Sequence, residues 1–147
     1  GSFLGADVAF FFSQGCALCK EIGNVFQEFN LFESAEITLV KPRYGLKTPE
    51  VYKAFQLQKS TSPTLPEIEN ELNLKRIPFF NDLEKAAFSI KPEMQTLKEK
   101  LKESGFTTVL MSGSGSSFIC LGEGFLLDSD LWRAKCRFIS RSENGWY

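Results

Sequence analysis

The segment of this chain best suited to phosphate chemistry is a run of glycine and serine, Met111-Ser-Gly-Ser-Gly-Ser-Ser-Phe118. A glycine-rich loop between two strands can leave backbone N–H groups free to face an anion. The run has no lysine at the position that a P-loop requires. A strand is expected after it, whereas a helix follows the glycine motif of dinucleotide-binding folds. On spacing alone, an ordinary hairpin turn explains the run equally well.

Two other segments place acidic side chains where they can do chemistry or cap a helix. Asp7, within Leu4-Gly-Ala-Asp-Val-Ala-Phe10, precedes a run of phenylalanines, where its carboxylate can serve as a general base or as a helix cap. On local grounds the helix cap is the simpler interpretation. The segment Asn81-Asp-Leu-Glu84 is, on the same grounds, the capped start of a helix.

Cysteines offer two further chemistries, thiol redox and metal binding. Cys16 and Cys19 form a C-x-x-C motif, which a redox protein places after a strand and at the start of a helix. A zinc site requires a second pair, but Cys120 and Cys136 are too far apart in sequence and the chain contains no histidine. We therefore expect reduced cysteines, as in a cytoplasmic protein, and no metal site.

Charge and hydropathy narrow the choice of partners. The formal net charge is −1, so the chain has no basic excess with which to neutralise a nucleic-acid backbone. The longest apolar run, residues 8–12, is far too short to span a bilayer. We expect neither a nucleic-acid nor a membrane partner. A length of 147 residues, 43% of them hydrophobic, fits one globular domain.

The elements that must position these residues follow from turn signals and apolar periodicity. Helices are expected after Thr48-Pro49, with Thr48 as the N-cap, after the capping box Thr64-x-x-Glu67, after Asn81 and after Pro92. The last of these helices should bury Met94, Leu97 and Leu101 and end at Gly105. Strands are expected at residues 15–20, 24–29, 36–40, 107–111, 118–121 and 132–140. The pattern predicts an α+β domain with helices on a mostly antiparallel sheet.

Read in order, several segments resemble the C-terminal half of the GHMP kinases, a superfamily of small-molecule kinases. They are Gly5-Ala-Asp-Val-Ala-Phe-Phe11, Gly15-Cys-Ala17 through Gly23, Val40-Lys-Pro42, Thr48 through Tyr52, Asn81-Asp-Leu-Glu84 and Met111 through Ser116. This resemblance covers nearly the whole chain. It implies a ferredoxin-like antiparallel sheet with helices packed on it, forming one C-terminal domain over residues 1–147. Residues 1–12 would be the remnant of an inter-domain segment, and the N-terminal ATP-binding domain would be absent.

Within the superfamily, the chain is most similar to a kinase of non-mevalonate isoprenoid biosynthesis. This similarity implies a small-molecule cytidine diphosphate substrate that is phosphorylated on an alcohol group. It also implies ATP and Mg²⁺ as cofactors, both requiring the missing N-terminal domain, and a location in the bacterial cytoplasm or in a plastid.

The resemblance also assigns roles to individual residues. Asp7 falls on the family's catalytic base, which takes the proton of the substrate hydroxyl as that oxygen attacks the γ-phosphoryl group of ATP. Tyr52 falls on the aromatic residue that stacks on the cytosine ring, with Thr48 nearby. The loop residues Gly113, Ser114, Gly115 and Ser116 would pack under the phosphate-binding loop. The chain departs from the family pattern at Ala9, usually proline, and at Asn24, usually glutamate.

Two expectations follow from the missing half. The 147 residues alone should be catalytically inactive, because a base without an ATP site cannot transfer a phosphoryl group. Apolar residues that the missing domain would cover, with Phe3, Phe10 and Phe11 as candidates, should favour a homodimer. Three alternatives stay open: another GHMP kinase, a non-catalytic ferredoxin-like ligand-binding module, and a thiol-redox protein that uses Cys16 and Cys19.

Overall fold

The computed structural model describes residues 6–29, 31, 35–56 and 62–139. The chain divides into two compact units. The first contains the residues up to Ala35, the segment Glu69–Ile77 and the residues from Arg137 onward; the second contains Glu36–Ile68 and Pro78–Cys136. The assignment of residues 1–147 to a single C-terminal domain stays a prediction.

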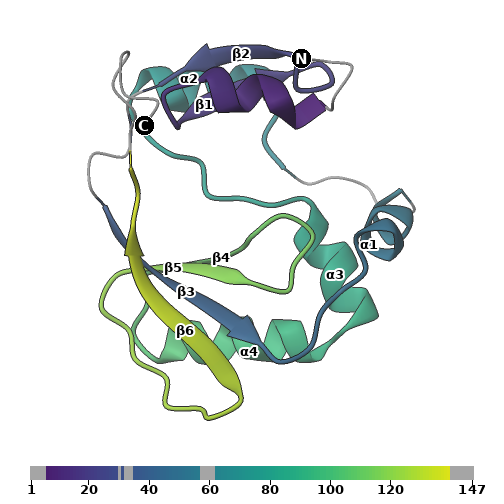
Figure 1. Ribbon diagram of the computed structural model, residues 1–147, viewed down its shortest axis with the longest axis vertical. Helices are drawn as coiled ribbons and strands as arrows, with labels where there is room; N and C mark the ends of the chain where they lie inside the picture. Colours follow the sequence, from purple (N-terminus) through teal and green to yellow (C-terminus); the bar gives the residue numbers. More distant parts are fainter. Residues whose placement is uncertain (1–5, 30, 32–34, 57–61, 140–147) are drawn as a thin grey trace. The chain divides into compact units, whose positions relative to one another are not determined.

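The second unit is built on a four-stranded sheet in the order β4-β5-β3-β6 (Figure 1). Its strands are β3 (Glu36–Pro42), β4 (Thr108–Met111), β5 (Phe118–Leu121) and β6 (Leu131–Arg137). Strand β5 is antiparallel to both β3 and β4, and its Phe118 lies opposite Val40 on one side and Met111 on the other.

Helices α1 (Thr48–Phe55), α3 (Leu83–Ile90) and α4 (Glu93–Glu103) belong to the same unit, while α2 (Leu65–Asn73) crosses the boundary between the units. Figure 1 shows α4 running along the sheet, while α3 packs beside α1 and contacts α4. The core of the unit lies where these helices meet the strands. Its buried residues are Val40, Val51, Ala86, Ala87, Met94, Leu97, Leu101, Phe106, Val109, Met111, Phe118 and Cys120.

Local signals explain where two of the helices lie. In α4 the apolar residues Met94, Leu97 and Leu101 fall on one face and are buried, as predicted. The helix ends at Glu103, and Gly105 follows its C-cap Ser104 with a φ of +105°, a conformation that glycine adopts without strain. The predicted capping box of α2 is also present, because the Glu67 carboxylate accepts hydrogen bonds from the N–H (2.7 Å) and the hydroxyl (2.8 Å) of Thr64.

The first unit contains a short hairpin and a 3₁₀ helix. Strands β1 (Ala17–Lys20) and β2 (Val25–Glu28) pair antiparallel, as the sequence predicts. The 3₁₀ helix η1 (Ala6–Phe12) covers the apolar run whose lack of period favoured neither helix nor strand. In the same unit, Lys20 of β1 forms an ion pair with Glu69 of α2.

The α+β class predicted from sequence is confirmed by these elements. One detail differs from a full β-α-β-β-α-β ferredoxin-like order, which has a helix before its last strand. Residues 122–130 join β5 to β6 here without a helix. Across the part of the chain that the structure describes, no helix is both long and apolar enough to cross a membrane.

Candidate functional site

The Gly/Ser loop, residues 112–117, turns the chain from β4 into β5. Two internal hydrogen bonds close it, from the N–H of Ser112 to the carbonyl of Ser117 (2.8 Å) and from the N–H of Gly115 to the carbonyl of Ser112 (3.0 Å). Gly115 has a φ of +90°, and a Cβ there would approach Leu46 Cδ1 and Met111 Sδ to 3.0 Å. This position therefore requires glycine.

Asn81 joins the start of α3 to this loop. Its side-chain N–H₂ group donates to the carbonyl oxygens of Met111 (2.8 Å) and Gly113 (2.7 Å). Its Oδ1 accepts the N–H of Leu83 (2.9 Å), the first residue of α3. Asn81 thus caps the start of α3 from the residue before its N-cap, Asp82, which itself makes no side-chain cap hydrogen bond. The contact of Asn81 with the loop could not be predicted from neighbouring residues in the sequence.

Glu84 binds the same part of the loop from the next turn of α3. Its Oε1 accepts the N–H of Met111 (2.9 Å), and its other oxygen forms an ion pair with Lys98 of α4. The two charged side chains are only 14% and 17% exposed. A carboxylate at this depth requires a partner charge, and Lys98 supplies it.

These contacts fall on the free edge of the sheet. β4 is the outer strand, and Ser112 and Ser117 exchange a hydrogen bond just beyond the β4–β5 ladder. Because antiparallel strands alternate in hydrogen bonding, the N–H and C=O of Met111 face away from β5. The N–H of Met111 donates to Glu84, and its C=O accepts a hydrogen bond from Asn81. Their side chains thus complete an edge that would otherwise leave backbone polar groups unpaired.

Thr48 ties the loop to α1. Its hydroxyl shares a hydrogen bond of 2.8 Å with the hydroxyl of Ser114. The expectation that Thr48 caps the helix is wrong, because the carbonyl of Lys47 already accepts the N–H groups of Glu50 and Val51. The helix therefore begins one residue earlier than expected, and the N-cap is Lys47, which makes no side-chain cap hydrogen bond.

Tyr52 follows Thr48 by one helical turn, so the two side chains share a face of α1. Tyr52 is 51% exposed. Within the second unit, the structure thus brings the predicted substrate residues and the predicted phosphate-supporting loop together through the contact between Thr48 and Ser114.

The far end of the loop is anchored to the segment after β3. Ser116 is buried, and its hydroxyl donates to the carbonyl of Tyr44 (2.7 Å). Lys91 Nζ lies 5.0 Å from the centre of the Tyr44 ring. Burial, and then the nearby Glu93 carboxylate, raise the pKa of Tyr44, so this phenol stays protonated.

Asp7 lies in η1, in the first unit. Its side chain is outside what the structure describes, so its role as a base stays a prediction. Phe3, a candidate for the exposed apolar surface, also lies outside the described residues. Phe10 and Phe11 pack edge to face, with ring centres 6.0 Å apart, and Phe11 is 56% exposed.

The cysteines do not have the arrangement that a thiol-redox site requires. Cys16 precedes β1 and Cys19 lies within it, so no helix begins at the motif. Burial raises the pKa of the Cys16 thiol, against a smaller lowering by the backbone of Leu31, whereas a redox nucleophile needs a lowered pKa. All four cysteines are free. Across the described ranges, no three His, Cys, Asp or Glu side chains are grouped closely enough to hold a metal ion.

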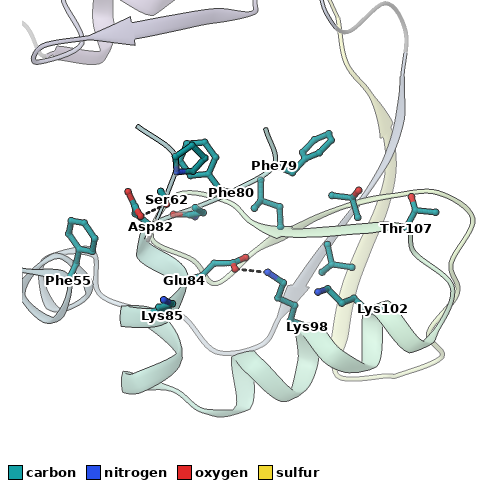
Figure 2. A pocket seen from close by; sticks show the side chains of 15 residues that line it. Phe55, Ser62, Phe79, Phe80, Asp82, Glu84, Lys85, Lys98, Lys102 and Thr107 are labelled. Atoms are coloured by element: carbon teal, nitrogen blue, oxygen red, sulfur yellow. Dashed lines mark hydrogen bonds and ion pairs between the residues drawn. The ribbon is translucent and has the colours of Figure 1, made fainter. Parts of the chain in front are cut away.

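A pocket of about 390 Å³ lies beside the contacts of Asn81 and Glu84 (Figure 2). The pair Glu84–Lys98 lies on its wall, with Lys102 one helical turn further along α4. Phe79 and Phe80 also line it and are partly exposed. No local pattern of residues predicts this pocket, because its walls come from segments far apart in the chain. Its lysines and phenylalanines would suit a ligand that combines an anionic group with an apolar part.

Comparisons with known proteins find that the chain is similar to kinases. Residues 62–125 match the family described as GHMP kinases C terminal. The chain is 45% identical over 147 residues to the 4-diphosphocytidyl-2-C-methyl-D-erythritol kinase of Protochlamydia amoebophila (strain UWE25). The aligned region covers 100% of this chain and 49% of that protein. It is 34% identical to the chloroplastic kinase of the same name from Arabidopsis thaliana, over 99% of this chain and 42% of that protein.

A solved structure of such a kinase is similar to this chain as well. The crystal structure of 4-(cytidine 5'-diphospho)-2C-methyl-D-erythritol kinase superimposes with a TM-score of 0.65 and 33% sequence identity, over 84% of this chain and 46% of that one. The chain spans about half the length of the curated relatives it matches.

Proposed function

This chain belongs to the GHMP kinases and carries the family's C-terminal domain, and on that premise we propose that it is the substrate-side part of an ATP-dependent kinase. The substrate of that kinase is 4-diphosphocytidyl-2-C-methyl-D-erythritol, and the reaction phosphorylates its 2-hydroxyl group in non-mevalonate isoprenoid biosynthesis. The observation that carries the proposal is 45% identity along the whole chain to a kinase named for this substrate.

The geometry of the second unit supports a substrate-side role. Tyr52 offers an exposed ring to a flat base, and Thr48 on the same face contacts the Gly/Ser loop. An arrangement of this kind can hold a nucleoside group and a phosphate group at a fixed separation. Stacking of a base on an aromatic side chain contributes about 1–3 kcal/mol.

The Gly/Ser loop has the features of an anion-binding turn. No described residue accepts a hydrogen bond from the backbone N–H of Gly113 or Ser114, and a Cβ at Gly113 would meet open space. These N–H groups can face a phosphate, either directly or behind a phosphate-binding loop. ATP would supply the γ-phosphoryl group, and Mg²⁺ would neutralise charge on the phosphates. We assign the binding of both to a part of the kinase that these residues do not include.

Asp7 is the proposed base. A carboxylate within hydrogen-bonding reach of the 2-hydroxyl would take its proton as the oxygen attacks, which contributes ~10²–10⁴ to the rate. We also propose a bacterial cytoplasmic or plastid location, because the relatives include bacterial and chloroplastic kinases.

The test is a phosphoryl-transfer assay on the full-length kinase that contains this chain. With ATP, Mg²⁺ and 4-diphosphocytidyl-2-C-methyl-D-erythritol, we expect one phosphate per substrate molecule, placed on the 2-hydroxyl group. Asp7→Asn should lower kcat by ~10²–10⁴ and leave binding of the cytidine group intact. Transfer to a different small alcohol would favour another GHMP kinase, and substrate binding without turnover would favour a ligand-binding module.

A further inference from the structure

We propose that Asn81 and Glu84 are positioning residues of the kinase, which hold the Gly/Ser loop in the shape that phosphoryl transfer requires. This inference rests on the proposed function. Neither side chain is expected to touch the substrate or ATP. They act through their hydrogen bonds to the backbone of Met111, at the end of β4, and of Gly113, in the exposed part of the loop.

Three side-chain hydrogen bonds converge on a few backbone atoms of the loop and its entry. Asn81 donates to the carbonyl oxygens of Met111 and Gly113, and Glu84 accepts the N–H of Met111. Asn81 thus brackets Ser112, the residue whose N–H and carbonyl close the loop. The peptide group before Ser112 and the peptide group after Gly113 therefore cannot rotate without breaking a hydrogen bond to Asn81.

The ion pair with Lys98 strengthens the contact between Glu84 and the loop. The Glu84 carboxylate is only 14% exposed and pairs with Lys98, and a hydrogen bond from the N–H of Met111 to an ion-paired carboxylate is stronger than one to a neutral acceptor. Helix α4 therefore contributes to the position of the loop although none of its residues lies in it. Capping of α3 alone would not require these contacts between Glu84, Lys98 and the loop, because Oδ1 of Asn81 already accepts the N–H of Leu83.

Two isosteric variants separate loop positioning from helix capping. Asn81→Asp keeps an oxygen that can accept the N–H of Leu83, but it removes both donated hydrogen bonds and places carboxylate oxygen against two carbonyl oxygens. Glu84→Gln keeps an oxygen for the N–H of Met111 but loses the charge that pairs with Lys98. The matched control is Glu67→Ala, which removes the capping contact of α2 in the same unit and touches no loop residue.

The experiment uses the full-length kinase and two readouts. Hydrogen exchange followed by mass spectrometry should show the peptide over residues 109–118 exchanging about tenfold faster in Asn81→Asp, with the peptides of α3 unchanged. Steady-state kinetics should show kcat lowered about tenfold or more, with KM for the cytidylyl substrate within about twofold of the wild type. Glu84→Gln should move both readouts in the same direction by less, and Glu67→Ala should move neither.

The outcomes separate the two proposals. A wild-type kinase that does not phosphorylate the substrate would overturn the proposed function. An active wild type combined with a wild-type kcat in Asn81→Asp and Glu84→Gln would overturn the positioning role alone. That role would also be overturned if loop exchange in both variants matched the wild type. If Asn81→Asp does not fold, Glu84→Gln and Lys98→Met carry the test with the same two readouts.

Discussion

At the scale of single residues, Tyr52 is the clearest candidate for direct contact with a ligand. Its ring is half exposed on α1, and no described aromatic or cationic side chain packs against it. A phenol ring in that position exposes apolar area that a flat base could cover. It can therefore be removed at little cost to the fold.

We expect Tyr52→Ala to weaken binding of the cytidylyl substrate by about 1–3 kcal/mol in the full-length kinase, measured by calorimetry. The unfolding free energy should change by less than about 0.5 kcal/mol. Tyr52→Phe is the matched control and should bind nearly as well as the wild type, because it keeps the ring. Equal binding by the wild type and Tyr52→Ala would remove Tyr52 from the site.

Cys120 gives a prediction on pH and stability. Burial raises the pKa of this thiol to about 12, whereas the ordinary thiol pKa is 9.0. The folded chain therefore keeps a proton that the unfolded chain releases as pH rises above 9. The stability gained from the protonated thiol is complete below pH 9 and is lost progressively between pH 9 and about 12.

Urea unfolding of the wild type and of Cys120→Ala, followed between pH 7 and 10.5, would check this prediction. The wild type should be the more stable protein at pH 7, because Cys120 fills part of the core. That advantage should shrink as pH rises above 9. A constant difference across the whole range would show that the thiol titrates alike in both states.

At the scale of elements, α4 is the helix on which the core of the second unit depends most directly. Leu101 is fully buried among residues from the sheet and from α3. We expect Leu101→Ala to lower the unfolding free energy by about 2–5 kcal/mol in a urea titration. Glu99→Ala, on the exposed side of the same helix, should change it by no more than about 0.5 kcal/mol. Similar effects from the two variants would mean that α4 is not packed as described.

Elements of this kind could be predicted from the sequence because their signals are local. The spacing of Met94, Leu97 and Leu101 identifies the buried face of α4, and Gly105 marks its end. The strands on either side of the Gly/Ser loop follow from the same kind of pattern. The run at residues 8–12 has no period, so its 3₁₀ conformation could not be read from the residues.

The candidate site was only partly predictable for the same physical reason. Thr48, Tyr52 and the loop were identified through the order of family motifs. The contacts that join them depend on tertiary packing, and Glu84 and Met111, which hydrogen-bond to each other, are separated by 27 positions in the chain. Thr48 was expected as a cap because Pro49 follows it. The carbonyl of Lys47 starts the helix earlier, which frees the Thr48 hydroxyl for Ser114.

At the scale of the whole molecule, exposed apolar side chains predict self-association of the chain. Phe11 and Phe12 at the end of η1 are both more than half exposed. Exposed apolar surface favours association, and the sequence predicts a homodimer through this region. We expect sedimentation velocity on the 147-residue chain to show a concentration-dependent dimer, which Phe11→Ser weakens. A single monomeric species at high concentration, in both proteins, would contradict this prediction.

Under the proposed function, these 147 residues form only part of a kinase. The chain spans 49% of the relative with which it shares 45% identity. Kinase catalysis consists mainly of positioning ATP and neutralising charge on its phosphates, and a base without those functions contributes nothing by itself. We therefore expect the chain alone to transfer no phosphate from ATP to 4-diphosphocytidyl-2-C-methyl-D-erythritol, while the full-length kinase does so under the same conditions.

Calorimetry on the chain alone would show whether it keeps part of the substrate site. Binding of the cytidylyl substrate that Tyr52→Ala weakens, without heat from ATP, would place nucleoside recognition in this part of the kinase. Adding the N-terminal half in trans should then restore transfer, and Asp7→Asn in this chain should suppress that restored activity. Phosphorylation by the chain alone would contradict the prediction that ATP binds outside these residues.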